Sequence, residues 1–495
     1  MNHQWATKAK EKKYTILLLL ILLFAFLIRV NFFIETRDQT LWWDEAEYMA
    51  VAKHFAMDTP FRYNPQRPPL FQYIAAGFFL MGAGEALIKF TLVVIPSTLL
   101  VLLIYLLGKE MYNQKVGLIA AFLASVHWSF LFWTARMQPD SFSMVFQVAA
   151  IWCAWRYWKE GKTKFMLLVG FLTAIALMFK VSALIVPLIL FVFVFLKERF
   201  EMFKRKEYYA SAAIFVITLI PYFLWSYAKF GTPLGFKRGY SNAFLYKTSF
   251  GWYNLKFFYL MTENLLFILF IAGLILGLRW ILYGDVLIKE KKRCFNPDMF
   301  SILSLIMVSA FYIFYVRGTE DRWVFLWMPF IFYLAANALI SVEKVITNIS
   351  SKKMVGTIVL VILLGGVGYM QIEHAANIIK QKLPTYAEVR DGGLWIKQNS
   401  NKGDTIISQS PPQIAYYSER EVFGIEEEQA VFEAFIREKK PNFVHVSIFE
   451  HHPDWIGQWL EKEKGALEPV WADFLNEEKS KVTSVIYRVH NEKFS

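Results

Sequence analysis

The residues with the clearest capacity for chemistry form an acidic group near the start of the chain. Asp44 and Glu45 lie in Trp42-Trp43-Asp44-Glu45-Ala46-Glu47-Tyr48. A carboxylate can take a proton from an incoming hydroxyl group, and Asp44 is a candidate for that base. If a helix begins at Asp44, Tyr48 lies one turn later on the same helix face. The sequence therefore predicts a short helix with acids in its first turn.

Basic residues recur in separate segments further along the chain. Arginine and lysine neutralise phosphate, and arginine does so with two parallel hydrogen bonds. Arg67 lies in Asn64-Pro65-Gln66-Arg67-Pro68-Pro69-Leu70, where the prolines predict a second short helix through Met81 with Arg67 at its N-terminal edge. Such cations beside acids suit transfer from a phosphate leaving group. The other candidates of this kind are Arg136, Asp140, Lys180, Asp321 and Arg322.

The composition shows where these segments must lie. Of 495 residues, 56% are hydrophobic and 19% charged, with 47 Phe, 24 Tyr and 17 Trp. No soluble interior of this size can bury so much apolar side chain, so we expect a membrane protein. The net charge of +12 then marks cytoplasmic loops rather than a nucleic-acid partner. Two cysteines are too few for a disulfide scaffold or a thiolate metal site.

Apolar runs and the lysines between them predict a topology. About eleven spans are expected, with a cytoplasmic N-terminus and an uncleaved first anchor in the cell membrane. The predicted spans are 14–34, 87–107, 116–134, 141–158, 165–179, 182–197, 208–228, 257–279, 299–316, 323–342 and 354–371.

The run from Phe165 to Leu196 is too long for one span. Basic residues flank it on both sides, so it is expected to cross twice with Lys180 at the outer turn. Charged residues near lipid are costly unless they are paired or functional. With this topology, the acidic and basic candidates share the outer face, in a first outer loop (35–86) and in later outer turns. The sequence therefore predicts one site there.

The segment after the last span is more polar, and its residue pattern differs from that of the spans. Helix-like segments (Glu426–Lys440, Asp454–Lys464) alternate with strand-like ones (Thr405–Gln409, Phe443–Phe449, Val482–Val489). We expect a transmembrane domain over 1–378 and a small extracytoplasmic α/β domain over 379–495.

Five motifs in this order resemble the GT-C superfamily of polyprenyl-phosphate-dependent glycosyltransferases. They are Asp-Glu in the first outer loop, a basic residue before Pro-Pro-Leu, Arg-x3-Asp after the third span, a Lys between paired spans, and Arg-aromatic before a late span. The protein O-mannosyltransferase and aminoarabinose transferase group is the most similar in pattern. The resemblance covers about residues 14–345.

The resemblance implies roles for individual residues. Asp44, with Glu45, matches the catalytic carboxylates, while Arg67 and Arg322 match residues that meet the donor phosphate. Lys180 is grouped with these two. Arg136, Asp140, Tyr48 and Asp321 are expected to support the site.

One departure concerns a metal. Aminoarabinose transferases have Glu-Lys-Pro-Pro, whose Glu can bind a metal, whereas this chain has Gln66-Arg67. We therefore expect no required cofactor and no metal site, a divalent metal being doubtful because Gln66 replaces a ligand.

Each candidate also has a purely structural interpretation. Asp44 could cap its helix, and Arg67 and Arg322 could be interfacial anchors. Lys180 could cap a helix end, and Asp140 could pair with Arg136 to close a span junction.

The resemblance and the outer cluster together predict an inverting membrane glycosyltransferase. Its donor is expected to be a polyprenyl-phosphate sugar and its acceptor a hydroxyl of a protein, lipid or glycan, with membrane lipid as surroundings and no nucleic-acid partner. The alternatives are a transporter or flippase of lipid-linked sugars and a non-catalytic scaffold.

Overall fold

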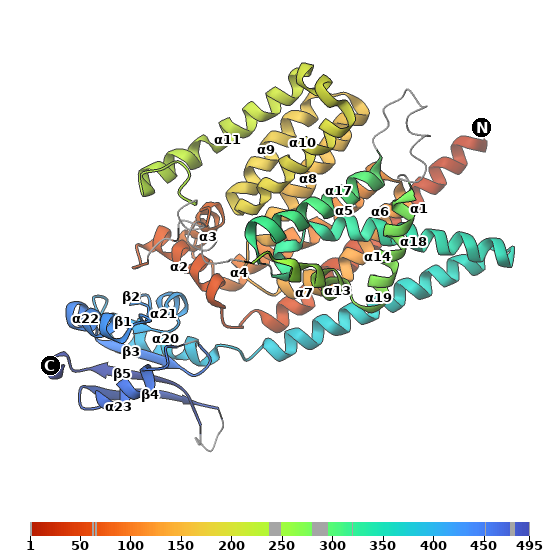
Figure 1. Ribbon diagram of the computed structural model, residues 1–495. Coiled ribbons are helices and arrows are strands. Elements are labelled where there is room, and N and C mark those ends of the chain that lie inside the picture. Colours follow the sequence, from red (N-terminus) through yellow and green to blue (C-terminus); the bar gives the residue numbers. More distant parts are fainter. Residues whose placement is uncertain are drawn as a thin grey trace.

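The computed structural model describes residues 2–61, 64, 67–236, 249–279, 296–318, 320–450, 452–475 and 481–494. It consists of a bundle of long helices and a small sheet domain at the C-terminal end (Figure 1). Helix α19 (Lys353–Lys382) leads from one into the other. This architecture confirms the predicted fold class, an α-helical polytopic protein with a C-terminal α/β domain.

Seven helices in the described part of the chain are long and apolar enough to cross a membrane. Three are single helices besides α19, and three are runs of consecutive helical segments. They are α1 (Asn2–Thr36), α4 (Glu85–Lys89) with η1 (Phe90–Val94) and α5 (Ile95–Met111), η2 (Val181–Leu184) with α10 (Ile185–Glu198) and η3 (Arg199–Lys204), α11 (Lys206–Phe230), α17 (Pro297–Ala310) with η5 (Phe311–Val316), α18 (Trp327–Ser350) and α19.

Two predicted spans are bent pairs of helices rather than single ones. Helices α6 (Gln114–Val126) and α7 (Trp128–Thr134) meet at 53°. The segment η4 (Trp252–Leu255) and α13 (Lys256–Thr262) meets α14 (Asn264–Gly277) at 115°. Counting each pair as one span raises the number in the described residues to nine.

The remaining two predicted spans are α8 (Asp140–Glu160) and α9 (Thr163–Phe179), which pack against each other. Helix α9 is a shorter apolar helix. The long run that contains Lys180 does divide as predicted, since this residue has an extended backbone between α9 and η2.

Two short helices lie between the bundle and the sheet domain. Helices α2 (Trp43–Met57) and α3 (Leu70–Leu80) pack on each other at the end of the bundle nearest the C-terminal domain (Figure 1). We call this end the domain face. Three of the segments predicted to share the outer side of the membrane meet here in the described residues. The first outer loop contacts the turn after α7 through Glu45 and Arg136, and it contacts the turn before α18 through Asp44 and Arg322.

The C-terminal domain has one five-stranded mixed sheet. Its strand order is β2-β1-β3-β5-β4, with β1 parallel to β2 and β3, and β5 antiparallel to β3 and β4. Ile406 and Phe443 pair in register and face α20 and α21, while Ile407 and Val444 face α22 and α23. The elements are α20 (Ala387–Asn399), β1 (Thr405–Ser408), α21 (Pro411–Ser418), β2 (Glu421–Phe423), α22 (Gln429–Lys439), β3 (Phe443–Ser447), α23 (Ile456–Lys462), β4 (Leu467–Phe474), β5 (Val482–Val489) and η7 (Asn491–Lys493).

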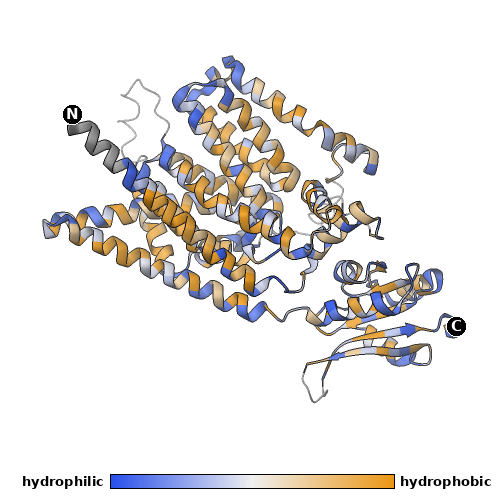
Figure 2. Cartoon of the chain, turned by 180° about the vertical axis from the view of Figure 1, so that it is seen from behind, coloured by the Kyte–Doolittle hydropathy of each residue, from blue (hydrophilic) through white to orange (hydrophobic). Residues whose placement is uncertain are grey.

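Hydropathy separates the two parts of the molecule. Figure 2 shows hydrophobic residues along most of the bundle helices and hydrophilic ones gathered at their ends, whereas the sheet domain mixes both kinds. This distribution is what a bundle in lipid and a domain in water require.

Candidate active site

Helix α2 presents the acidic group as predicted. It begins at Trp43 after the N-cap residue Trp42, so Asp44 and Glu45 lie in its first turn. The side chains of these two acids differ in exposure, at 26% for Asp44 and 2% for Glu45. Asp44 is therefore the accessible acid of the pair.

Asp44 joins two arginines that come from distant segments. Arg67 Nη2 donates to Asp44 Oδ1 at 2.5 Å, and Arg322 Nη2 donates to Asp44 Oδ2. Burial alone would raise the pKa of Asp44, but the charges of the two arginines outweigh it and lower the pKa from 3.8 to about 2. The predicted base and the two predicted phosphate ligands thus form one cluster.

Arg67 is held from the side of α2. Its guanidinium is 2.9 Å from Glu47 Oε2 and lies over the ring of Tyr48, 4.6 Å from the centroid. Burial lowers the pKa of Arg67, yet Tyr48, Glu47 and Asp44 outweigh burial and raise it well above its usual value. The residue keeps its charge, and Tyr48 contacts it.

Arg322 is held by η6 (Asp321–Val324), the short helix before α18. Its Nε donates to Glu320 Oε2 at 2.7 Å, and its guanidinium lies 5.0 Å from the centroid of the Trp133 ring. Asp321 faces away toward α7, where it accepts from Trp133 Nε1 at 2.6 Å and from Ser129 Oγ at 2.9 Å. Asp321 therefore anchors η6, and Glu320 orients the arginine directly.

Lys180 and Asp140 form an ion pair beside Arg322. The alternative pairing of Asp140 with Arg136 is wrong. The turn after α9 brings Lys180 to Asp140 at the start of α8, whereas Arg136 lies beside Glu45. A small pocket has Asp140, Lys180 and Arg322 in its wall, together with Gln147, Tyr312 and Trp323. The pocket places polar groups next to the arginine that contacts Asp44.

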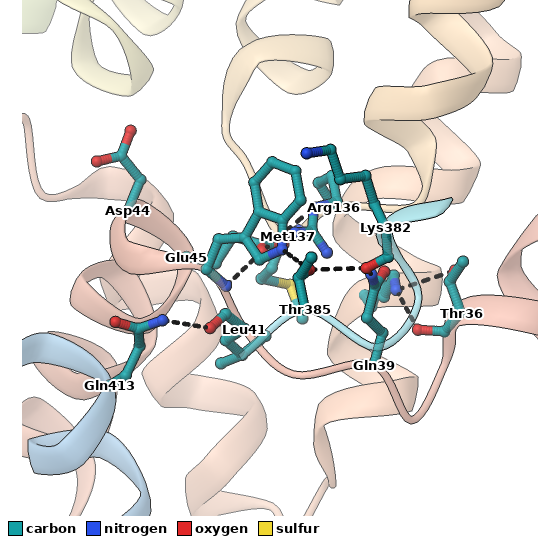
Figure 3. Close-up of polar contacts among 12 residues, drawn as sticks. Thr36, Gln39, Leu41, Asp44, Glu45, Arg136, Met137, Lys382, Thr385 and Gln413 are labelled. Carbon is teal, nitrogen blue, oxygen red and sulfur yellow. Dashed lines mark hydrogen bonds and ion pairs between the residues drawn. The ribbon is translucent and has the colours of Figure 1, made fainter. Parts of the chain in front are cut away.

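Glu45 and Arg136 lie apart from this cluster, in a second network. Figure 3 shows the Asp44 carboxylate pointing away from Glu45. Glu45 Oε2 accepts from Trp42 N at 2.8 Å and lies 3.5 Å from Arg136 Nε, while Glu45 Oε1 accepts from Met137 N. The Arg136 guanidinium stacks on the Trp42 ring at 3.4 Å. This pair fixes the start of α2 against the loop after α7.

Residues of the C-terminal domain complete this second network and have no signal in the sequence. Thr385 Oγ1 accepts from Trp42 Nε1 at 3.0 Å, and Tyr417 OH accepts from Leu41 N at 2.9 Å. These partners are more than 340 positions apart in the chain. Tyr417 reaches Leu41 because α21 docks on α2, and Thr385 reaches Trp42 from the connector between α19 and α20.

The described residues contain no group of three or more His, Cys, Asp or Glu side chains arranged for a metal ion. Gln66, on which the sequence argument about a metal rested, lies outside the described residues. Both carboxylate oxygens of Asp44 are hydrogen-bonded to arginines, so a cation would have to displace one of them.

An apolar groove of about 530 Å³ runs beside the site. It lies between α13 and α14 on one side and α17 and η5 on the other. Ile313 and Phe314 line the groove, whereas the neighbouring Tyr312 lines the polar pocket, so η5 separates the two. The other groove residues are Leu255, Phe258, Tyr259, Phe267, Phe270, Ile271, Leu274, Ile302, Leu305, Ile306, Ser309 and Ala310.

This fold is shared with membrane glycosyltransferases whose structures are known. The apo structure of ArnT from Cupriavidus metallidurans superposes with a TM-score of 0.64 at 10% identity, covering 97% of this chain and 98% of that one. The apo oligosaccharyltransferase of Archaeoglobus fulgidus gives a TM-score of 0.65 at 14% identity, covering 87% of this chain and 69% of that one. A complex of the Cupriavidus ArnT with undecaprenyl phosphate superposes with a TM-score of 0.62 at 11% identity, covering 94% and 97%.

A family model also matches the sequence directly. The model described as dolichyl-phosphate-mannose-protein mannosyltransferase aligns with residues 66–225. That segment includes Arg67, Arg136, Asp140 and Lys180 but neither Asp44 nor Arg322. A search of curated proteins found no sequence match. The family match and the fold together confirm the resemblance to the GT-C superfamily.

Proposed function

We propose that this protein is a membrane glycosyltransferase that moves a sugar from a polyprenyl-phosphate-linked donor to an acceptor hydroxyl, with inversion, at the outer face of the cell membrane. The domain face is the outer face, the N-terminus is cytoplasmic, and no metal is required. The acceptor is a hydroxyl of a protein, lipid or glycan.

The observation that carries this proposal is the bridge from Asp44 to Arg67 and Arg322. One carboxylate accepts a hydrogen bond from each of two partly buried guanidiniums. A phosphate group offers the same kind of acceptor oxygens with more charge, so it can replace the carboxylate between them. A site built in this way binds a phosphate and leaves a carboxylate beside it.

Replacement by phosphate also prepares Asp44 for its role. A carboxylate with a pKa near 2 is a weak base. When the donor phosphate takes up the arginine N–H groups, the two positive charges are shared with it, and the pKa of Asp44 rises toward its ordinary range. Donor binding thus precedes base activation.

These groups alone account for the proton and the bonds that change in the transfer. Asp44 takes the proton of the acceptor hydroxyl as its oxygen bonds to the anomeric carbon. The bond from that carbon to the phosphate oxygen breaks, and its electron pair leaves with the lipid phosphate. Arg67 and Arg322, with Lys180 beside them, stabilise the charge that develops there. Attack opposite the leaving group inverts the configuration.

The apolar groove suits the lipid tail of such a donor. Its lining is almost wholly hydrocarbon and it lies across η5 from the pocket that contains Arg322. A polyprenyl chain in the groove would bring its phosphate toward that arginine.

In a transporter of lipid-linked sugars, broken spans and buried charges would be expected to face the cargo. In coupled transporters, unwound backbone in a broken helix binds the cargo. Here the carbonyl oxygen of Met261, at the bend of α13 and α14, lies 2.7 Å from His127 Nε2 and accepts from Trp128 Nε1 at 3.1 Å. Thr262 O accepts from Gln371 Nε2 at 2.8 Å. The freed carbonyls are therefore satisfied by protein.

The buried charge within α1 is also satisfied by protein. Arg29 donates to Ser97 Oγ at 2.7 Å and to the carbonyl oxygens of Ala25, Ala124 and Ser125. This pattern is structural and favours the enzyme over the transporter.

The test uses purified full-length protein in detergent. It receives lipid-linked sugars and acceptor material extracted from the membranes of the source organism, and free polyprenyl phosphate is measured by mass spectrometry. The parent protein should release it only when acceptor is present, and Asp44→Asn should release at least about 100-fold less. Asp38→Asn, an exposed acid in the same loop, is the matched control. Release of polyprenyl phosphate at the same rate with and without acceptor, or no release by the parent, would contradict the proposal.

A further inference from the structure

The two residues that precede α2 make three hydrogen bonds with the C-terminal domain. Leu41 N donates to Tyr417 OH at 2.9 Å, and Leu41 O accepts from Gln413 Nε2 at 3.4 Å. Trp42 Nε1 donates to Thr385 Oγ1 at 3.0 Å. The backbone of Leu41 and the indole of Trp42 are thus both held by that domain.

Thr385 is itself fixed to the end of the last span. Its hydroxyl donates to Lys382 O at 2.7 Å, and the same carbonyl oxygen accepts from Gln39 Nε2 (Figure 3). Tyr386 follows in a left-handed backbone conformation with φ of 65° and packs its ring edge-on to Trp42 at 6.4 Å. Residues of the connector between α19 and α20 therefore hold the Trp42 ring by a hydrogen bond and a ring contact.

The Trp42 ring is enclosed on its other side by Arg136 at 3.4 Å and Phe132 at 6.0 Å. Because Trp42 is the N-cap of α2, its position sets where the first turn of the helix begins. Asp44 lies two residues further on, in that turn. A shift of the Trp42 ring moves the Asp44 carboxylate relative to Arg67 and Arg322, which come from other elements.

We infer that Thr385 is a positioning residue for the reaction, which acts through Trp42 to place Asp44 between the donor and the acceptor. The inference rests on the proposed function and extends it by giving the C-terminal domain a part in catalysis. Thr385 does not touch the arginines that bind the phosphate, so its effect on the placement of the base should exceed its effect on donor binding.

Three variants of the full-length protein test this inference. Thr385→Val keeps the shape and removes the hydroxyl, and Thr385→Ser keeps the hydroxyl. Trp42→Phe removes the indole N–H together with part of the ring that contacts Arg136. Thr483→Val is the matched control, because its buried hydroxyl donates to Asp473 Oδ2 at 2.7 Å in the same domain but away from α2. Steady-state turnover of the extracted lipid-linked sugars gives kcat and the KM for donor.

Loss of one hydrogen bond to a partly buried N–H group should lower kcat of Thr385→Val about two- to tenfold with a smaller change in the KM for donor. Thr385→Ser should restore kcat, and Trp42→Phe/Thr385→Val should be no slower than the slower single variant. Thr483→Val should match the parent. A Thr385→Val enzyme with the parent's kcat, or one that loses as much in KM as in kcat, would overturn the inference.

Amide hydrogen exchange separates this inference from the proposed function. Exchange at residues 41–46 should be faster in Thr385→Val than in the parent and in Thr483→Val, whether or not any sugar is transferred. An inactive parent with faster exchange in the variant would refute the proposed function and leave the coupling of Thr385 to α2 intact. Unchanged exchange in an active enzyme would refute the coupling.

Discussion

Asp44 and Arg322 lie 278 positions apart in the chain, and the guanidinium of one donates directly to the carboxylate of the other. The contact joins the first turn of α2 to the short helix before α18. With Arg67 on the other oxygen, it places a candidate base between two candidate phosphate ligands. The predictions below depend on this arrangement.

The two arginines should each contribute to binding of a lipid phosphate. Arg67→Ala or Arg322→Ala removes charge-assisted hydrogen bonds and should weaken binding of undecaprenyl phosphate about tenfold or more. Native mass spectrometry or fluorescence titration in detergent measures the affinity. Arg37→Ala, which changes an exposed arginine at the start of the loop between α1 and α2, is the control and should bind like the parent.

Asp44 should contribute to stability in a pH-dependent way. Its pKa is about 2 in the folded protein against 3.8 ordinarily, so its contribution is fully present above about pH 5 and is lost as the pH falls toward 2. The difference corresponds to about 2 kcal/mol. Thermal unfolding in detergent should show Asp44→Asn less stable than the parent at pH 7, with the gap shrinking toward pH 3. A gap that stays constant with pH would argue against the ion pairs.

The pair of Asp140 and Lys180 should behave as a buried unit. Asp140 is 4% exposed in its side chain, so Lys180→Met leaves an uncompensated carboxylate and should lower the free energy of unfolding by about 3 kcal/mol. Asp140→Asn/Lys180→Met should recover most of that loss. Thermal unfolding of the two single variants and the double variant checks it, and simple additivity would show that the two side chains are not coupled.

Transfer should not depend on a divalent metal. Both oxygens of Asp44 are hydrogen-bonded to arginines in the free protein, which leaves no lone carboxylate for a cation. Turnover should therefore be unchanged after treatment with EDTA and after addition of Mg²⁺ or Mn²⁺. A rate that falls with EDTA and returns with one metal would assign a different role to Asp44.

The sequence allowed the central cluster to be predicted because charge placement and span order constrain it strongly. Asp44, Arg67 and Arg322 stood out as charges at one membrane face, and the structure brings all three together. Asp140 and Lys180 were predicted for the same site, but their pairing was not, because it depends on how the turn after α9 meets α8.

Other features could not be predicted for physical reasons. Glu45 follows Asp44 in sequence, yet adjacent residues on a helix point in different directions, and Glu45 bonds Trp42 N and Met137 N instead. The predicted span 257–279 contains the polar residues Thr262, Glu263 and Asn264, and the chain bends there, with a φ of 50° at Glu263. The high average hydropathy of the whole run favoured one straight span and concealed this break. The contact of Trp42 with Thr385 arises only from domain docking.

The central claim is that Asp44 acts as the base and shares its arginines with the donor phosphate. Measuring the affinity of Asp44→Asn for undecaprenyl phosphate alongside its transfer rate tests it most directly. The variant should bind the lipid phosphate at least as tightly as the parent, because a competitor for Arg67 and Arg322 is gone, while transfer should fall at least about 100-fold. Transfer at the parent's rate, or an affinity weakened as much as in Arg67→Ala, would contradict it.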